Sequence, residues 1–190
     1  MNWLNISYIN GLNIISGPSN TGKTSIAKSI DYIYGSKKEN TPFSVNDTGY
    51  NKVEMIINPH QGIFSLERLF DDNKIIVNEI TDGRKKFYKE YNARNGNNII
   101  SHFWLSMIGI DNPLQIIKNE SFVRQNFGWR TFSPSTLISQ NKIDSETSVL
   151  LPDMRQQTAF LVCFIYFMRM ISMIQKKKKQ KNKERFEENQ

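Results

Sequence analysis

The sequence is poor in cysteine, histidine and long apolar runs, and these shortages exclude several classes of protein. The single cysteine, Cys163, cannot form an internal disulfide, so a disulfide scaffold is excluded and a reducing, cytoplasmic location is expected. The N-terminus has no basic segment followed by an apolar one, so no secretory signal is expected. Apolar residues make up only 38% of the 190 residues, but aromatic residues make up 12%. The chain therefore has the material for a core, and neither a collagen-like nor a wholly disordered chain fits.

Positive charge is concentrated at the C-terminal end. Residues 175–190 contain seven lysines and arginines against three glutamates, which is +4 of the net charge of +7. The rest of the chain is nearly balanced, so composition alone predicts no basic surface on its body. The tail is either a solvated segment or a contact for nucleic acid or anionic lipid.

Short-range patterns predict strands and one helix in the first half of the chain. Residues Trp3–Ile9 and Leu12–Ser16 flank Asn10-Gly11, a pair typical of a tight hairpin turn. Apolar residues at helical spacing predict a helix over Lys23–Tyr34, ending at Gly35. Residues 36–49 are polar and punctuated by glycine and proline, which indicates a loop. Three runs, within residues 53–57, 63–70 and 75–80, are joined by turn residues and predict an antiparallel meander; apolar and polar residues alternate in the first two.

The second half is less regular. We interpret residues 84–97 as a polar loop or a short edge structure, and Ile99–Ile110 as a helix that ends near Gly109. Residues 119–134 carry no clear pattern, although Ser133-Pro134-Ser135 could begin a short helix, and mostly helix is expected from Pro152 onward. These patterns divide the chain into a lobe (1–151), an apolar helix (152–175) and a basic tail or the start of a coiled coil (176–190).

One motif predicts chemistry. Gly17 to Thr24, GPSNTGKT, fits the phosphate-binding pattern G-x-x-x-x-G-K-[ST] at every fixed position. The two glycines let the backbone curl so that its N–H groups point at a phosphate, and the following helix adds a positive end. We expect Lys23 to contact the β- and γ-phosphates of ATP and Thr24 to ligate Mg²⁺. The predicted phosphate-binding set is Gly17, Pro18, Ser19, Asn20, Thr21, Gly22, Lys23, Thr24 and Ser25.

The residues that hydrolysis would also need are hard to find. An acidic residue at the end of an apolar strand normally holds the metal, and the nearest match is LFDD at Leu69 to Asp72. Only two apolar residues precede these acids, so a turn is the better interpretation. The two histidines, His60 and His102, lie outside any nucleotide motif and are interpreted as structural.

The P-loop, the run KVEMIIN and the run IFSLERLF together resemble the N-terminal lobe of coiled-coil ABC-type ATPases. This group contains the structural-maintenance-of-chromosomes (SMC) proteins, RecN-like repair proteins and AAA-type prokaryotic relatives. Phe64, Leu66 and Arg68 are similar to an apolar-x-apolar-x-Arg pattern common in this lobe. STLISQNKIDSETSVLL resembles the segment that holds the Q-loop glutamine, which falls on Gln140. Gln125 matches less well, and Gln140 also reads as an ordinary exposed amide.

The resemblance covers roughly residues 3–150 and implies a fold and an activity. The implied fold is α/β: a P-loop NTPase lobe of the ABC/SMC type with an antiparallel meander beside the P-loop strand and helix, plus a C-terminal helix. Lys23 and Gln140 would be catalytic, and Thr24 and Gln140 would hold Mg²⁺. The family's signature loop, acidic metal ligands and switch histidine lie in a C-terminal lobe after a coiled coil. Because the sequence reaches Gln190 as such a coil would begin, either the chain is a fragment or the rest comes from another polypeptide. A C-terminal lobe or a homodimer partner is expected to complete the site.

Three functions are compatible with these observations. The first is an ATP-binding half-site of an SMC-like ATPase in DNA repair, DNA maintenance or defence, with DNA as a possible partner and hydrolysis only when the site is completed. The second is a small P-loop kinase of a nucleotide or metabolite, which would alternate strands and helices after the P-loop. The third is a nucleotide-binding module without catalytic activity. The strands in series over residues 50–80 favour the first function.

An apolar segment near the C-terminus allows two interpretations. Residues 159–168 are an uninterrupted apolar run, which Arg169 ends and a lysine-rich stretch follows. A spanning helix needs about 20 apolar residues, so a membrane helix is the less favoured alternative. The other interpretation is a helix that packs against the lobe on one side and leaves an apolar patch for a partner on the other.

Overall fold

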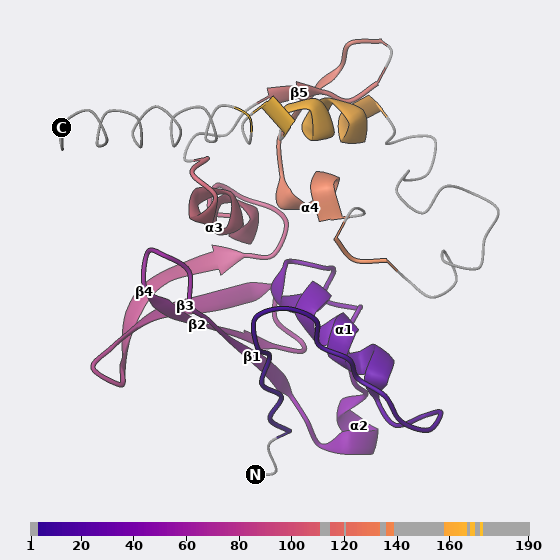
Figure 1. Ribbon diagram of the computed structural model, residues 1–190, viewed down its shortest axis with the longest axis vertical. Coiled ribbons are helices and arrows are strands. Elements are labelled where there is room, and N and C mark those ends of the chain that lie inside the picture. Colours follow the sequence, from indigo (N-terminus) through magenta and orange to yellow (C-terminus); the bar gives the residue numbers. More distant parts are fainter. Residues whose placement is uncertain are drawn as a thin grey trace, which may run out of the picture. The chain divides into compact units, whose positions relative to one another are not determined.

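The computed structural model describes residues 4–110, 115–119, 121–133, 136–138, 158–166, 168, 169 and 172 (Figure 1). The chain divides into two compact units, Met1–Asp111 and Asn112–Gln190. The first unit contains the four-stranded sheet and the segment from Gly17 to Thr24, and the second contains a small hairpin and the apolar helix. The described fold is α/β, with an antiparallel sheet and a few helices.

The sheet of the first unit is a meander in which each strand pairs with the next. Its strands are β1 (Lys52–Ile57), β2 (Ile63–Leu69), β3 (Lys74–Thr81) and β4 (Arg84–Asn92), all antiparallel. The predicted three-stranded meander is therefore confirmed. The interpretation of residues 84–97 as a loop or a short edge structure was right about the edge, since β4 is an edge strand of the sheet, and wrong about the length, since residues 84–92 form a full strand. That strand has no apolar alternation, and its pairing with β3 stabilises it instead.

Helix α1 (Lys23–Ile33) lies beside the sheet and contacts β1 and β2. Its C-terminus is the predicted glycine cap. Gly35 has φ +90°, its N–H bonds the carbonyl of Tyr32 at 3.1 Å, and the N–H of Ser36 bonds the carbonyl of Asp31 at 3.2 Å. This pair of bonds is the Schellman motif, which satisfies the last carbonyls of a helix. The predicted helix is confirmed to within one residue.

The inner face of the sheet and helix α3 (Ile100–Met107) share an aromatic core. Leu66, Ile75 and Val77 are fully buried, and the ring of Phe64 lies 5.5 Å from that of Phe103 in an edge-to-face contact. The helix predicted over Ile99–Ile110 is therefore confirmed, and Gly109 follows its end with φ +81°. Because these side chains alternate along β2 and β3, the other sheet face is left to polar and mixed residues.

Two predictions for the first 49 residues differ from the structure. Residues 4–16 contain no strand, although Asn10-Gly11 is a turn, in which the side chain of Asn13 bonds the N–H and carbonyl of Ile9 at 3.0 and 2.8 Å. A two-stranded hairpin is marginal without a third strand to cover it. The second difference is helix α2 (Val45–Thr48), one turn within the segment predicted as a loop.

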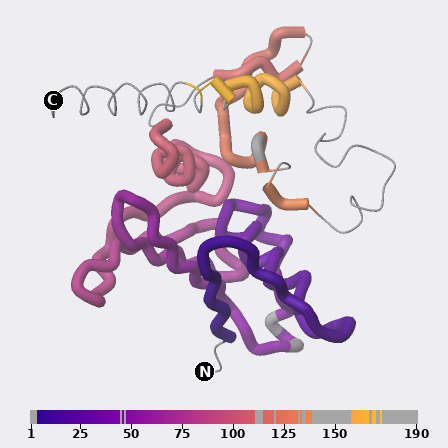
Figure 2. Tube along the Cα trace, in the orientation of Figure 1, coloured from indigo at the N-terminus to yellow at the C-terminus, as the bar shows by residue number. Residues whose placement is uncertain are grey.

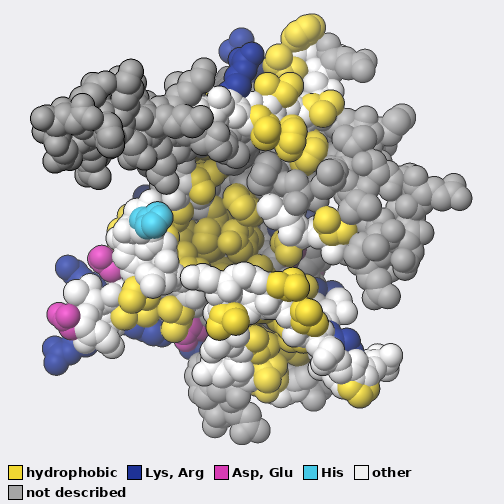
Figure 3. Space-filling view, in the orientation of Figure 1, with side chains coloured by type: hydrophobic (Ala, Val, Ile, Leu, Met, Phe, Trp, Pro, Cys, Tyr) yellow, Lys and Arg dark blue, Asp and Glu magenta, His cyan; other side chains and the backbone are white. Residues whose placement is uncertain are grey.

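The N-terminal segment, residues 4–16, leads directly into the segment from Gly17 to Thr24 (Figure 2). It is largely exposed. Apolar side chains gather on the face of the molecule where this segment runs (Figure 3). Within residues 4–16, the apolar side chains that are more than one-third exposed are Leu4, Ile6, Tyr8, Ile9, Leu12, Ile14 and Ile15.

The second unit has its own small core. Strands β5 (Gln115–Ile117) and β6 (Arg124–Asn126) form an antiparallel hairpin, and α4 (Trp129–Phe132) follows. α4 ends at Phe132, and Pro134 and Ser135 of the helix start predicted at Ser133-Pro134-Ser135 lie outside the described residues, so that helix stays a prediction. Residues 158–166 are helical, with Ala159, Phe160 and Cys163 buried while Leu161, Phe164 and Ile165 are exposed.

The buried side chains of this helix lie on one side of it, and the exposed apolar side chains lie on the other. Among the described residues, no helix has the length and apolarity that a membrane crossing requires.

Candidate phosphate-binding loop

The loop from Gly17 to Thr24 connects the N-terminal segment to α1. Gly22 precedes the helix with φ +81°, and Asn20 has φ +61°. A residue with a β-carbon is strained at such positive φ values, although asparagine tolerates them better than most. The sequence thus places glycine and asparagine where the backbone must curl.

The ammonium group of Lys23 lies inside this curl. Its Nζ donates to the carbonyl of Gly17 at 2.8 Å, to the carbonyl of Pro18 and to the hydroxyl of Thr21 at 3.3 Å. Thr21 Oγ1 in turn donates to the carbonyl of Pro18 at 2.8 Å. The N–H groups of the Lys23 ammonium therefore bond three oxygens of the loop and hold it closed around a positive charge.

The N-terminus of α1 is open to an anion. In the described part of the chain no side chain caps this helix, and its first turn contains no acidic residue. The first-turn N–H groups and the helix dipole therefore face the loop without a competing acceptor. The combination of free amides, a dipole and Lys23 is suited to phosphate oxygens.

Thr24 fits a magnesium ion that arrives with a nucleotide. Its side chain is exposed in the first turn of α1, next to Lys23. Mg²⁺ prefers six oxygen ligands and usually takes several from phosphates and water, so one protein hydroxyl is an adequate contribution. No cluster of three or more histidine, cysteine, aspartate or glutamate side chains that could hold a metal by itself occurs among the described residues.

The sequence predicted one other site residue, Gln140, and set aside Asp71, Asp72, His60 and Gln125. Gln140 lies outside the described residues, so its predicted contact with Mg²⁺ stays a prediction. Asp71 and Asp72 lie in the turn after β2, as interpreted, where Asp72 Oδ1 accepts the N–H of Lys74 at 3.1 Å. His60 is exposed in the turn after β1, and Gln125 lies on β6.

His102 lies on α3, on the helix that the sequence predicted. Burial and the nearby charge of Lys89 lower the pKa of its imidazole below the ordinary value of 6.5. A histidine that is neutral near pH 7 and packed on a helix supports the structural interpretation.

Sequence reasoning missed the role of one buried cation. Arg68 on β2 is only 1% exposed, and its guanidinium donates to the carbonyl oxygens of Tyr32 and Ser36 at the end of α1. The sequence pattern did indicate that Arg68 points inward, because it follows Phe64 and Leu66 at alternating positions of one strand and must share their face. Sequence alone does not say that the end of α1 lies opposite.

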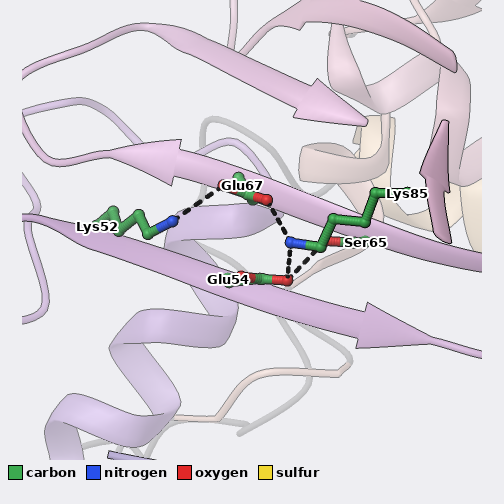
Figure 4. A network of polar contacts seen from close by, with 5 residues as sticks. All are labelled: Lys52, Glu54, Ser65, Glu67 and Lys85. Atoms are coloured by element: carbon green, nitrogen blue, oxygen red, sulfur yellow. Dashed lines mark hydrogen bonds and ion pairs between the residues drawn. The ribbon is translucent and has the colours of Figure 1, made fainter. Parts of the chain in front are cut away.

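An ion-pair network lies on the outer face of the sheet (Figure 4). Glu54 and Glu67 stand opposite each other on β1 and β2, and Lys85 of β4 reaches an oxygen of each at 2.7 Å. Lys52 adds a second contact to Glu67 at 3.1 Å, and Ser65 donates to Glu54 at 2.8 Å. The four charges cancel, so this network stabilises two carboxylates that would otherwise repel and offers no charged site.

Comparisons with known proteins add nothing to this geometry: no family model, curated protein or solved structure matches the chain. The functional argument therefore depends on the motif and on the geometry of the loop.

Proposed function

We propose that this chain binds Mg-ATP at the loop from Gly17 to Thr24 and forms the nucleotide-binding half of an SMC-like ATPase. The observation that carries the proposal is the position of Lys23. Its ammonium lies at the centre of a closed glycine-containing loop, directly before a helix whose N-terminus has no capping side chain. That arrangement concentrates positive potential where a triphosphate would sit.

The roles of the residues follow from their chemistry. The backbone N–H groups from Asn20 to Ser25 bind the β-phosphate, and Lys23 exchanges its carbonyl partners for the β- and γ-oxygens. Thr24 holds Mg²⁺ through its hydroxyl, and the metal neutralises charge on the phosphates when it is bound. In the family resemblance, Gln140 adds a ligand to the metal and orients the attacking water.

The site is proposed to be incomplete without a partner. The apolar side chains of residues 4–16 are exposed beside the P-loop, as expected of a segment that another lobe covers. In the described part of the chain, the acids nearest to a metal-binding pattern, Asp71 and Asp72, lie in a turn and not at the end of an apolar strand. A C-terminal lobe or a second subunit would supply the missing acid, and the role in DNA repair, maintenance or defence rests on the resemblance alone.

The antiparallel meander favours this proposal over the kinase alternative. A small P-loop kinase alternates strands and helices after the P-loop and builds a parallel sheet. Here β1 to β4 follow one another with tight turns between them. A nucleotide-binding module without catalysis is compatible with the same geometry, and turnover measured with a partner separates it from an ATPase half-site.

Calorimetric titration of Mg-ATP into the full chain tests the proposal. Wild type is compared with Lys23→Ala, which removes the cation inside the loop, and with Lys28→Ala, which removes an exposed cation on the same helix. Charge-assisted contacts of this kind contribute roughly 1.5–3 kcal/mol each, so Lys23→Ala should weaken binding by at least tenfold. Lys28→Ala should bind within about threefold of wild type.

The possible outcomes distinguish specific binding of ATP at the loop from attraction of ATP to the overall charge of the helix. Equal loss in both lysine variants would mean that the helix attracts ATP only by its overall charge. Wild-type affinity in Lys23→Ala, or no binding by wild type, would contradict the P-loop assignment.

A further inference from the structure

The C-terminal end of the P-loop helix is fastened to the sheet by two buried side chains. Arg68 Nη1 donates to the carbonyl of Tyr32 at 2.6 Å and to that of Ser36 at 2.9 Å, and Arg68 Nε donates to the carbonyl of Asp72 at 3.3 Å. These carbonyls belong to the end of α1, to the residues just after it and to the turn after β2. One guanidinium therefore joins two segments that are more than 30 residues apart in the sequence.

Tyr32 makes the reverse connection. Its hydroxyl lies 2.8 Å from the carbonyl oxygen of Phe70 and 2.9 Å from that of Leu69, so it donates to the end of β2. The guanidinium of Arg68 also stacks over the Tyr32 ring, 3.8 Å from its centroid. Burial raises the pKa of Tyr32, against the opposing charge of Arg68, so the hydroxyl keeps its proton and stays a donor. We call Arg68 and Tyr32 together the helix clamp.

The clamp holds the opposite end of the helix from the phosphate site. The 11 residues of α1 span about 16 Å from Lys23 to Ile33, which is too far for Arg68 to act on a phosphate through its charge. A helix is stiff, however, and a tilt at one end displaces the other. The Schellman motif at Gly35 already satisfies the last turn of α1, so the bonds of Arg68 add a connection between elements.

We propose that Arg68 and Tyr32 are positioning residues, which fix the P-loop helix against the sheet and thereby set the affinity of the loop for Mg-ATP. The inference rests on the proposed function for its ligand, but the clamp's effect on the loop is measurable without any ligand. It also gives the arginine of the IFSLERLF run a physical role: it is a donor fork that reaches α1 from an inward position of β2.

The test uses the full chain and two conservative variants. Arg68→Lys keeps a positive charge but loses the fork, and Tyr32→Phe keeps the ring but loses the donor. The matched control is Val77→Ala, which creates a cavity at a fully buried position of β3 and weakens the fold without touching the clamp. All four proteins are assayed well below their own unfolding midpoints, which circular dichroism establishes first.

Two quantities are measured: the Kd for Mg-ATP, and the hydrogen-exchange rates of the amides of residues 22–26 in the nucleotide-free protein. A displacement near 1 Å can lower the rate of a preorganised catalytic site by about a hundredfold, and we expect phosphate binding to be similarly sensitive to geometry. Arg68→Lys should therefore raise the Kd for Mg-ATP by roughly tenfold or more, and Tyr32→Phe should raise it by less. The same variants should speed exchange at Ile26, whose amide bonds the carbonyl of Gly22 at 3.2 Å, while the first-turn amides before it serve as the fast-exchanging reference. Val77→Ala should change neither quantity at these positions.

Each result decides the question. Wild-type affinity and exchange in both clamp variants would overturn the inference, and so would an equal effect in Val77→Ala, since that would show a general loss of stability. If wild type itself does not bind Mg-ATP, the proposed function fails. The exchange rates then decide alone whether the clamp positions the loop.

Discussion

Two glycines in this chain have the same local conformation but different surroundings, so one substitution at each separates backbone strain from steric overlap. Gly35 follows α1 with φ +90°, and Gly109 follows α3 with φ +81°. Both close Schellman motifs: the N–H of Gly109 bonds the carbonyl of Ser106 at 2.9 Å, and the N–H of Ile110 bonds that of Leu105 at 2.9 Å. A β-carbon at Gly109 would meet nothing within 4 Å, whereas at Gly35 it would lie 2.5 Å from the carbonyl oxygen of Ala93.

The expected magnitudes follow from these distances. The left-handed conformation costs an alanine roughly 1–2 kcal/mol, and the stiffer unfolded chain returns about 0.4–1 kcal/mol. Gly109→Ala should therefore lower the free energy of unfolding by about 1 kcal/mol. Gly35→Ala carries the same strain and must also displace the backbone at Ala93, and overpacking of that kind costs about 1–3 kcal/mol more. Its total should be about 2–4 kcal/mol.

Urea unfolding followed by tryptophan fluorescence and circular dichroism measures both variants against wild type. Equal losses at Gly35 and Gly109 would refute the close approach of the end of α1 to the backbone at Ala93. A loss of several kcal/mol at Gly109 would refute the open surroundings assigned to that position.

Three further predictions concern the site and its supporting fold. The isolated chain should hydrolyse ATP far more slowly than about 1 s⁻¹, the low end of ordinary enzymes, and a phosphate-release assay that gives turnover near that rate without a partner would contradict the incomplete site. Burial raises the pKa of Glu67, but hydrogen bonds from Lys85 and Lys52 outweigh it and hold that pKa below the ordinary 4.5. The stability from this network is therefore present above about pH 4.5 and is lost as the pH falls through the lowered pKa. Glu67→Gln should cost about 1 kcal/mol or less in urea unfolding at pH 7, and the cost should shrink progressively as the pH is lowered below 4.5. A cost that does not change with pH would argue against the network. Burial raises the pKa of Cys163 to about 12, so a thiol reagent at pH 8 should label it much more slowly in the native chain than in urea, and equal rates would show an exposed thiol.

Local patterns predicted the elements that carry their own apolar residues. Helical spacing and Gly35 predicted α1, alternation within residues 53–57 and 63–70 predicted β1 and β2, and the apolar run that begins at Ile75 predicted β3. β4 was missed because Arg84–Asn92 has no such stripe and is ordered by its neighbour β3. The N-terminal hairpin is the opposite case, in which strands were predicted and none formed. Its residues favour strands, but no third strand covers them in the described structure.

The candidate site likewise has one part that consecutive residues predict and one part that only the packing of distant segments creates. The P-loop was predicted because its chemistry depends on eight consecutive residues, from Gly17 to Thr24, whose spacing is fixed. The helix clamp was not predicted, because Arg68 and Tyr32 meet only after β2 and α1 have packed. Long-range contacts of this kind leave at most an unusual residue in the sequence, here an arginine at an inward position of a strand.

The most direct measurement of the central claim is the amide spectrum of the ¹⁵N-labelled chain during titration with Mg-ATP. If the loop holds the phosphates, the largest shifts fall on the amides from Asn20 to Ser25, saturate together, and disappear in Lys23→Ala while its remaining spectrum stays folded. If these amides do not move, or if the shifts cluster elsewhere and persist in Lys23→Ala, the loop from Gly17 to Thr24 is not the nucleotide site.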